Sequence, residues 1–179
     1  MEELNELKRR LEQERPAAWN ELPDIALYMD QIIAYMSRQL IRFDQDEKLT
    51  PAMVNNYIKD GLVPRAEGKR YGPVHLGYLT AMCALKRVLS VREIGVLLSA
   101  AQARGNPPET LYGYFTNALD AALTETARSL EELDDPKDLA RTALDLALRS
   151  YANQLACARL LDLMQESGQA GPSPKKTTK

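Results

Sequence analysis

The residues of this sequence best suited to chemistry are gathered between positions 50 and 71. Their side chains are amides, cations, hydroxyls and phenols: Thr50, Asn55, Asn56, Tyr57, Lys59, Arg65, Lys69, Arg70 and Tyr71. An asparagine amide can bond bidentately to the edge of an adenine, and lysine or arginine can bind phosphate oxygens. The set therefore has the chemistry of a DNA contact, and its alternative is an ordinary solvated surface.

A helix is expected to carry the first half of this set. Thr50 is a good N-cap, and Pro51 suits the first helical position, where its missing amide hydrogen costs nothing. Gly61 ends the helix because glycine accepts the left-handed backbone of a C-cap. Apolar residues at helical spacing define the buried face, namely Met53, Val54, Tyr57 and Ile58. Asn55 and Asn56 fall on the other face, and two adjacent asparagines are poor choices for helix stability alone.

A basic loop is expected to follow this helix. Pro64 blocks further helix, so residues Arg65 to Tyr71 are expected to form a short hairpin or loop that turns at Glu67-Gly68. Three cations in the loop suit contact with phosphate. The ring of Tyr57 is expected in the core with its hydroxyl near the surface, whereas Tyr71 either packs the loop or contacts the DNA backbone.

Three runs of the sequence resemble, in the same order, the N-terminal domain of MerR-type regulators. They read VNNYIKDGLVP, KRYGPVHLGYL and LKRVLSVREIGVLL. The features shared with that pattern are Tyr57, Gly61, Leu62, Pro64, Arg70, Tyr71, Leu85, Lys86, Ser90, Glu93 and Ile94. Asn55 and Asn56 depart from it, because MerR proteins commonly have Arg and Tyr there and the Arg is a phosphate contact.

A closer similarity is to a small uncharacterised bacterial family, filed as a domain of unknown function, whose members open with a stretch like the Leu22 to Asp30 segment LPDIALYMD. The resemblance covers roughly Leu22 to Ala100. It implies an all-α protein with a winged helix-turn-helix DNA-binding domain over residues 22–104, in which the helix from Thr50 to Asp60 enters the major groove and the loop from Arg65 to Tyr71 clamps the backbone.

Composition and cysteine count exclude several other classes. The chain has 179 residues, 45% hydrophobic and 27% charged, as in globular proteins. No apolar run reaches the length of a membrane span and the acidic N-terminus is unlike a signal peptide, so the cytoplasm is expected. Cys83 and Cys157 are expected to be buried free thiols. With His75 as the one histidine and no phosphate-binding loop or nucleophile motif, neither an enzyme nor a metal or cofactor site is expected.

Charge is distributed unevenly along a chain whose net charge is −2. Residues 38–104 carry 11 Lys or Arg against 6 Asp or Glu, whereas residues 105–170 carry 5 against 11. The basic segment coincides with the proposed DNA-contacting residues, which is the pattern of a nucleic-acid footprint. The acidic total favours the alternative of an adaptor that binds protein.

The remaining residues predict helices around this segment. Residues 1–21 are expected to form an N-terminal helix and a linker, and Asp24 to Leu40 a scaffold helix, followed by a polar connection containing Asp44, Asp46 and Glu47. Further helices are expected at Pro73 to Val88 and Ser90 to Arg104. The Gly105 to Pro108 segment is the clearest boundary in the chain.

Beyond that boundary, residues 107–166 are expected to form an antiparallel pair of helices that dimerises. The second helix is apolar on more than one face, with candidate interface residues Leu139, Leu146, Tyr151 and Leu155. The aromatic residues Tyr112, Tyr114, Phe115 and Tyr151 are expected to serve core and dimer packing, and their alternative is a pocket for a small-molecule effector of unknown identity. Residues 167–179 have the composition of a disordered tail.

Together these patterns predict a sequence-specific, repressor-like transcriptional regulator that binds double-stranded DNA as a homodimer. The alternative is a protein-interaction adaptor built on a winged-helix frame without DNA affinity.

Overall fold

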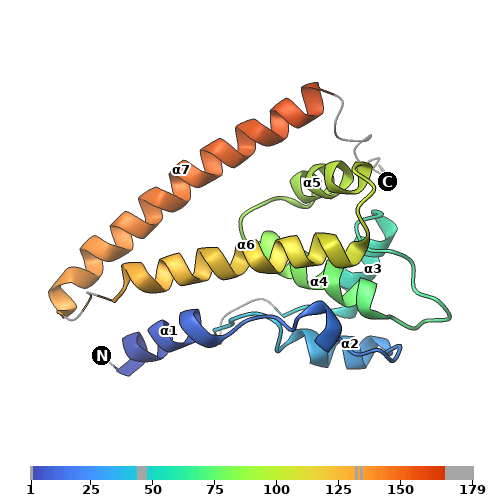
Figure 1. The fold of residues 1–179 in the computed structure, drawn as a ribbon, viewed down its shortest axis with the longest axis horizontal. Helices are drawn as coiled ribbons and strands as arrows, with labels where there is room; N and C mark the ends of the chain where they lie inside the picture. The colour runs from blue at the N-terminus through green and yellow to red at the C-terminus, as the bar shows by residue number, and fades with distance from the viewer. Residues whose placement is uncertain (1, 44–47, 132, 134, 168–179) are drawn as a thin grey trace.

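The computed structural model describes residues 2–43, 48–131, 133 and 135–167, and it is all-helical (Figure 1). The described residues contain no β-strand, and their only ladder pairing is two isolated bridges. The elements are α1 (Glu2–Gln13), η1 (Trp19–Glu21), α2 (Met29–Met36), α3 (Pro51–Lys59), α4 (Pro73–Leu85), α5 (Val91–Ala103), α6 (Pro108–Ser129), η2 (Pro136–Asp138) and α7 (Leu139–Glu166). The predicted all-α class is confirmed. The acidic connection at 44–47 and the tail from 168 onward lie outside the described residues.

A body made of α2, α3, α4 and α5 surrounds one apolar core. α4 lies at its centre, with Leu76, Leu79 and Met82 fully buried. The other helices contribute buried side chains to the same cluster, among them Ile32, Met36, Val54, Tyr57 and Ile94. Burial of these side chains is the main favourable term in folding the body.

The scaffold helix is shorter at both ends than the predicted Asp24 to Leu40. α2 begins only at Met29 because the preceding segment is extended and paired with the chain near residue 71. The backbone amide and carbonyl of Leu27 exchange two hydrogen bonds with Tyr71, each 2.9 Å long. A residue in that conformation cannot also belong to a helix, and the pairing joins residues too far apart in sequence for helical periodicity to reveal.

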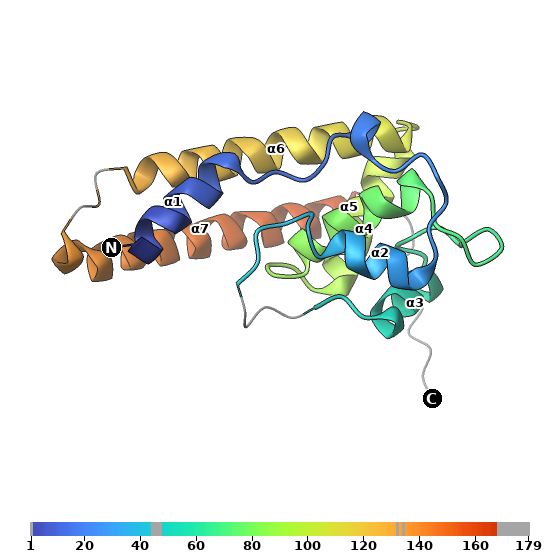
Figure 2. The same ribbon diagram turned by 90° about the horizontal axis from the view of Figure 1, so that it is seen from below.

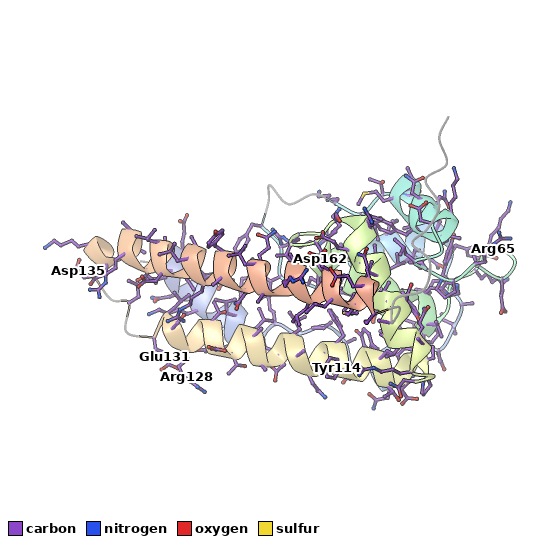
Figure 3. All side chains as sticks on the ribbon, turned by 90° about the horizontal axis from the view of Figure 1, so that it is seen from above. Arg65, Tyr114, Arg128, Glu131, Asp135 and Asp162 are labelled. Carbon is purple, nitrogen blue, oxygen red and sulfur yellow. The ribbon has the colours of Figure 1, made fainter. Side chains whose placement is uncertain are left out.

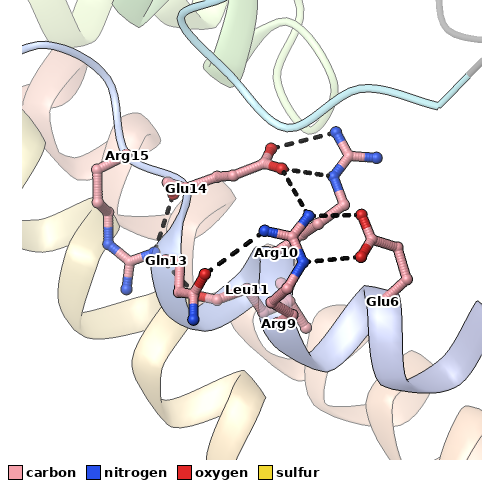
Figure 4. A network of polar contacts seen from close by, with 7 residues as sticks. All are labelled: Glu6, Arg9, Arg10, Leu11, Gln13, Glu14 and Arg15. Atoms are coloured by element: carbon pink, nitrogen blue, oxygen red, sulfur yellow. Dashed lines mark hydrogen bonds and ion pairs between the residues drawn. The ribbon is translucent and has the colours of Figure 1, made fainter.

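α1 packs along α6 rather than fraying, as Figure 2 shows. Its own charges are arranged in pairs three and four residues apart, such as Arg9 with Glu6 and Arg10 with Glu14 (Figure 4). Side-chain contacts fasten the α1 segment to α6 and to the turn that follows it. Arg15, just beyond α1, forms an ion pair with Asp120 of α6, and Lys8 Nζ donates to the carbonyl of Leu133, beyond the end of α6, at 3.1 Å.

The first part of α6 is packed into the body. Tyr112 is buried, its ring tilted against Trp19 with centroids 5.8 Å apart, and its hydroxyl donates to the carbonyl of Ala17 at 2.8 Å. Gly77 of α4 permits this contact, since a Cβ there would lie 3.2 Å from the Tyr112 ring. The Gly105 to Pro108 segment is thus a corner between packed helices.

α7 runs back in the opposite direction to α6 (Figures 1 and 2). Its main packing partner is α5, not α6. Gln154 Nε2, for example, donates to the carbonyl of Val88, just before α5, at 3.4 Å. Leu161 is its one residue described as buried, in a helix of 28 residues. α7 therefore leaves most of its surface to solvent.

Candidate nucleic-acid interface

α3 presents the predicted polar face to solvent. The helix begins where expected, since Thr50 Oγ1 accepts a hydrogen bond from the backbone amide of Met53 at 3.3 Å and Pro51 is the first helical residue. Val54 and Tyr57 are buried against the body, which confirms the core position of the Tyr57 ring. Asn55, Asn56 and Lys59 are exposed, as are Pro51 and Ala52 in the first turn.

The basic loop is a tight hairpin. The amide of Glu67 donates to the carbonyl of Arg70 at 3.2 Å, and the amide of Arg70 donates to the carbonyl of Glu67 at 3.0 Å. The two central residues, Gly68 and Lys69, have φ of +56° and +65°, the signature of a type I′ turn. Lys69 is the one described non-glycine residue with positive φ. Arg65, Lys69 and Arg70 are all exposed.

Two anchors hold the base of the hairpin on the body. Tyr71 is buried and pairs with Leu27, so packing rather than solvent contact accounts for its ring. The imidazole of His75 joins both ends of the loop. Its Nδ1 accepts from the amide of Gly72 at 3.0 Å, and its Nε2 lies 3.2 Å from the carbonyl of Arg65. With Nδ1 as the acceptor, Nε2 is the ring nitrogen placed to donate to the Arg65 carbonyl.

Arg70 is held by a residue outside the predicted set. Its Nη2 donates to the hydroxyl of Tyr28 at 3.1 Å, and its guanidinium lies 5.3 Å from the centroid of the Tyr28 ring. Tyr28 is 49% exposed and belongs to the chain before α2. Neither Tyr28 nor His75 was singled out from the sequence. His75 had a local signal, three residues beyond Gly72 at a helix start, whereas Tyr28 had none.

The structure thus divides the nine predicted residues into two kinds. Tyr57 and Tyr71 pack the body. The other seven are exposed on α3 or on the hairpin: Thr50, Asn55, Asn56, Lys59, Arg65, Lys69 and Arg70. In Figure 3, Arg65 lies at one end of the molecule. Arg128 and Asp135 lie at the opposite end, where α6 is connected to α7. The exposed acids here are Asp60, directly after α3, and Glu67 of the hairpin. They are outnumbered by the exposed cations Lys59, Arg65, Lys69 and Arg70.

The predicted aromatic residues do not form one cluster. Tyr112 lies between Trp19 and Phe115, and burial raises the pKa of its hydroxyl to about 12. Tyr114 and Tyr151 are 78% and 61% exposed. α4, α5 and α6 enclose an apolar groove of about 280 Å³ that Tyr112, Tyr114 and Phe115 help to line, whereas Tyr151 does not.

The four predicted dimerisation residues lie on two sides of α7. Tyr151 and Leu155 share one face and are 61% and 56% exposed. Leu139, 44% exposed, and Leu146, half-buried, point the other way by helical spacing.

Other sites are sparse in the part of the chain that the structure describes. Cys83 is buried as expected, whereas Cys157 is only half-buried, and neither forms a disulfide in the described residues. Within the described ranges, no three His, Cys, Asp or Glu side chains are grouped as metal ligands. No described helix combines the length and apolar character needed to cross a membrane.

Comparison with known proteins identifies the family of this chain. Residues 17–115, more than half of the 179, match the model of a family described as Domain of unknown function (DUF1836), and the chain belongs to that family. The match includes α2 to α5, the hairpin and the start of α6. No curated protein and no solved structure matches the chain.

Proposed function

We propose that this member of the DUF1836 family is a cytoplasmic, sequence-specific DNA-binding regulator of transcription, repressor-like and active as a homodimer. In this proposal α3 enters the major groove and the hairpin of residues 65–71 lies on the phosphate backbone, as in a winged helix-turn-helix of MerR type. One observation carries it: the exposed amides of α3 and the exposed cations of an ordered hairpin stand on the same body.

The chemistry of α3 suits base contact. Asn55 and Asn56 are held on a helix by the buried Val54 and Tyr57, so their amides are presented on a rigid element. A side-chain amide can donate to adenine N7 and accept from its N6 amine. Lys59, at the last turn, suits a phosphate.

The hairpin suits backbone contact because its cations are placed by structure and not by flexible chain. The type I′ turn sets the direction of Lys69, and Tyr28 orients Arg70. Contacts of this kind fix the register of a protein on a duplex without reading sequence. Each phosphate neutralised steepens the salt dependence of log K by about 0.9.

A homodimer suits this reading because two copies related by a two-fold axis present two recognition helices to a palindromic site. α6 and α7 form the dimerising part in this proposal. The apolar groove beside Phe115 is where a small-molecule effector would fit.

The test is fluorescence anisotropy of labelled duplexes, taken from the region upstream of the protein's own gene and from generic sequence, at two salt concentrations. The variant Lys69→Glu with Arg70→Glu is expected to bind at least about 100-fold more weakly at low salt, with a salt slope shallower by about 1.8 per protomer. The matched control is Arg128→Glu with Arg149→Glu, which makes the same change in net charge at exposed positions of α6 and α7. Circular dichroism checks that all three proteins are folded.

Wild-type affinity equal to that of the hairpin variant, at both salts and on both duplexes, would overturn the proposal. Specificity is tested separately by selection from a random-sequence duplex library. Asn55→Ala is expected to relax the selected sequence at one position while leaving the salt slope unchanged.

A second candidate, the protein-interaction adaptor, is favoured by a different observation. α7 exposes large apolar side chains, and Asn55 stands where MerR proteins commonly have the phosphate-binding Arg. An adaptor predicts poor DNA affinity that the hairpin substitutions hardly change.

A further inference from the structure

Four of the exposed apolar side chains of α7 form one straight stripe. Leu144, Leu148, Tyr151 and Leu155 are 59%, 56%, 61% and 56% exposed. They follow one another at intervals of four, three and four residues, the spacing of a heptad seam. At a rise of about 1.5 Å per residue the stripe is about 16 Å long. Soluble proteins rarely leave such a row of large apolar side chains in water without a partner for it.

The body of the same chain does not reach this stripe. Leu161, the buried residue of α7, lies more than a quarter-turn away from this stripe around the helix. Small residues flank the stripe, with exposed alanines at Ala140, Ala147 and Ala152. Small flanking side chains allow a second helix to approach closely.

We infer that this stripe is the contact between two copies of the chain, and that the two α7 helices pair antiparallel across a two-fold axis near residues 149 and 150. In this register Leu148 meets the partner's Tyr151, and Leu144 meets the partner's Leu155. The pairing is isologous, so each contact occurs twice. The inference deepens the homodimer of the proposed function, but it does not depend on DNA binding.

The charges on α7, and on η2 directly before it, select both the occupant and its direction. Arg141 precedes the stripe by three residues and Asp162 follows it by seven, so both continue the seam. A parallel pair would set Arg141 against its own copy and Asp162 against its own copy. The antiparallel pair sets Lys137 opposite the partner's Asp162.

A second pair of residues beside the antiparallel seam also carries opposite charges. Asp138 comes beside the partner's Arg159, and both side chains are exposed in the single chain. Arg159 Nη1 now lies 3.4 Å from Glu166 of its own helix, an exposed contact that solvent screens. The charges therefore match this chain to a reversed copy of itself, which is why the occupant is a second copy and not an unrelated helix.

The first test measures association without DNA, by sedimentation equilibrium. Leu148→Glu with Tyr151→Glu places acids opposite one another at the centre of the seam and is expected to weaken dimerisation at least about 100-fold. Leu160→Glu with Leu163→Glu is the matched control, because these residues are 60% and 44% exposed on another side of α7. The control is expected to change the dissociation constant less than about 3-fold.

A wild-type chain that stays monomeric at about 100 µM would overturn the inference. So would a seam variant that associates as tightly as its control. Because every substitution is on an exposed surface of α7, loss of folding is not expected, and circular dichroism verifies it. The seam variant keeps α3 and the hairpin intact, so failure of dimerisation and failure of DNA binding give different results.

The second test determines direction by disulfide trapping in a Cys157→Ser background. In the antiparallel register position 158 faces position 141 of the partner. Mixing Ala158→Cys chains with Arg141→Cys chains is therefore expected to give a cross-linked heterodimer, while Ala158→Cys alone gives little. Efficient cross-linking of Ala158→Cys with itself would show a parallel pair and overturn the register.

Discussion

The α3 end and the α7 end of this molecule expose opposite kinds of side chain. α3 is nine residues long, buries Val54 and Tyr57, and turns amides and a cation to solvent. α7 is 28 residues long, has one residue described as buried, and turns a stripe of leucines and a tyrosine to solvent. The polar surface of α3 is stable in water. Each square ångström of apolar surface on the α7 stripe, by contrast, would gain about 25 cal/mol if it were buried. The α3 end is complete within one chain, and the α7 end becomes complete with a partner.

The largest expected effect comes from making the same substitution, leucine to alanine, at a buried position of α4 and at an exposed position of α7. Leu76→Ala, at a fully buried position of α4, is expected to lower the free energy of unfolding by about 3 kcal/mol through lost burial and a cavity. Leu155→Ala, at a position 56% exposed, is expected to change it by less than about 0.5 kcal/mol in the monomer. Urea unfolding of both, built on the monomeric Leu148→Glu and Tyr151→Glu variant, measures the difference. Equal losses would mean that α7 packs on the body more closely than the structure indicates.

The start of α3 provides the next largest effect. Thr50→Ala removes the hydroxyl that accepts from the Met53 amide, and about 1 kcal/mol of stability is expected to be lost. Thr50→Ser keeps the oxygen and is expected to stay near wild type. Urea midpoints of the two variants test this, and a Ser variant as unstable as the Ala variant would show that the hydroxyl is not the cause.

A smaller effect is expected from the residue that orients Arg70. Tyr28→Phe removes the hydroxyl that accepts from Arg70 Nη2 but keeps the ring beneath the guanidinium, so DNA affinity is expected to fall about 3-fold. Tyr28→Ala removes both contacts and is expected to lower it about 10-fold. Tyr114→Phe, at an exposed tyrosine of α6, is the control. Anisotropy that ranks Phe with Ala would assign the whole effect to the hydroxyl.

The smallest effect concerns α5, the helix on which α7 rests. The Ser90 hydroxyl, and then the Ser90 amide at 2.7 Å, lower the pKa of Glu93 below its ordinary value. At a pH between the pKa of Glu93 in the folded chain and its higher pKa in the unfolded chain, the unfolded chain binds more protons. The stabilisation that the Glu93 carboxylate contributes is therefore fully present above the unfolded pKa and is lost as the pH falls through the folded pKa. Urea midpoints are expected to fall slightly less for Glu93→Gln than for wild type between about pH 5 and pH 3. Parallel curves would show that the carboxylate contributes nothing.

Local signals in the sequence were sufficient wherever a helix is started by its own side chains. Thr50 with Pro51 begins α3, and Ser90 caps α5, as predicted; the structure adds Glu93 as the second member of a capping box. The turn at Glu67-Gly68 was also predictable, because glycine is the residue that accepts positive φ most easily. These features depend on atoms within about four residues of one another, which a sequence displays directly.

Contacts between distant segments were beyond such signals. The pairing of Leu27 with Tyr71 shortens α2, and the contact of Tyr28 with Arg70 spans 42 residues. The clamp that His75 places across the hairpin depends on where α4 brings its imidazole. Each of these contacts forms only when the body folds around its core, so helical periodicity and capping signals do not predict it.

By itself, the sequence determined the all-α class, the starts of α3 and α5, the positions of the polar and basic residues, and the apolar excess of α7. Those properties follow from side-chain chemistry and its helical period. The tertiary structure decided which of the remaining residues face water: it buried Tyr71, joined the hairpin to the chain before α2, and placed α7 on α5 with its apolar stripe outward. Periodicity says that a face is apolar, and only the position of neighbouring elements says whether that face is covered.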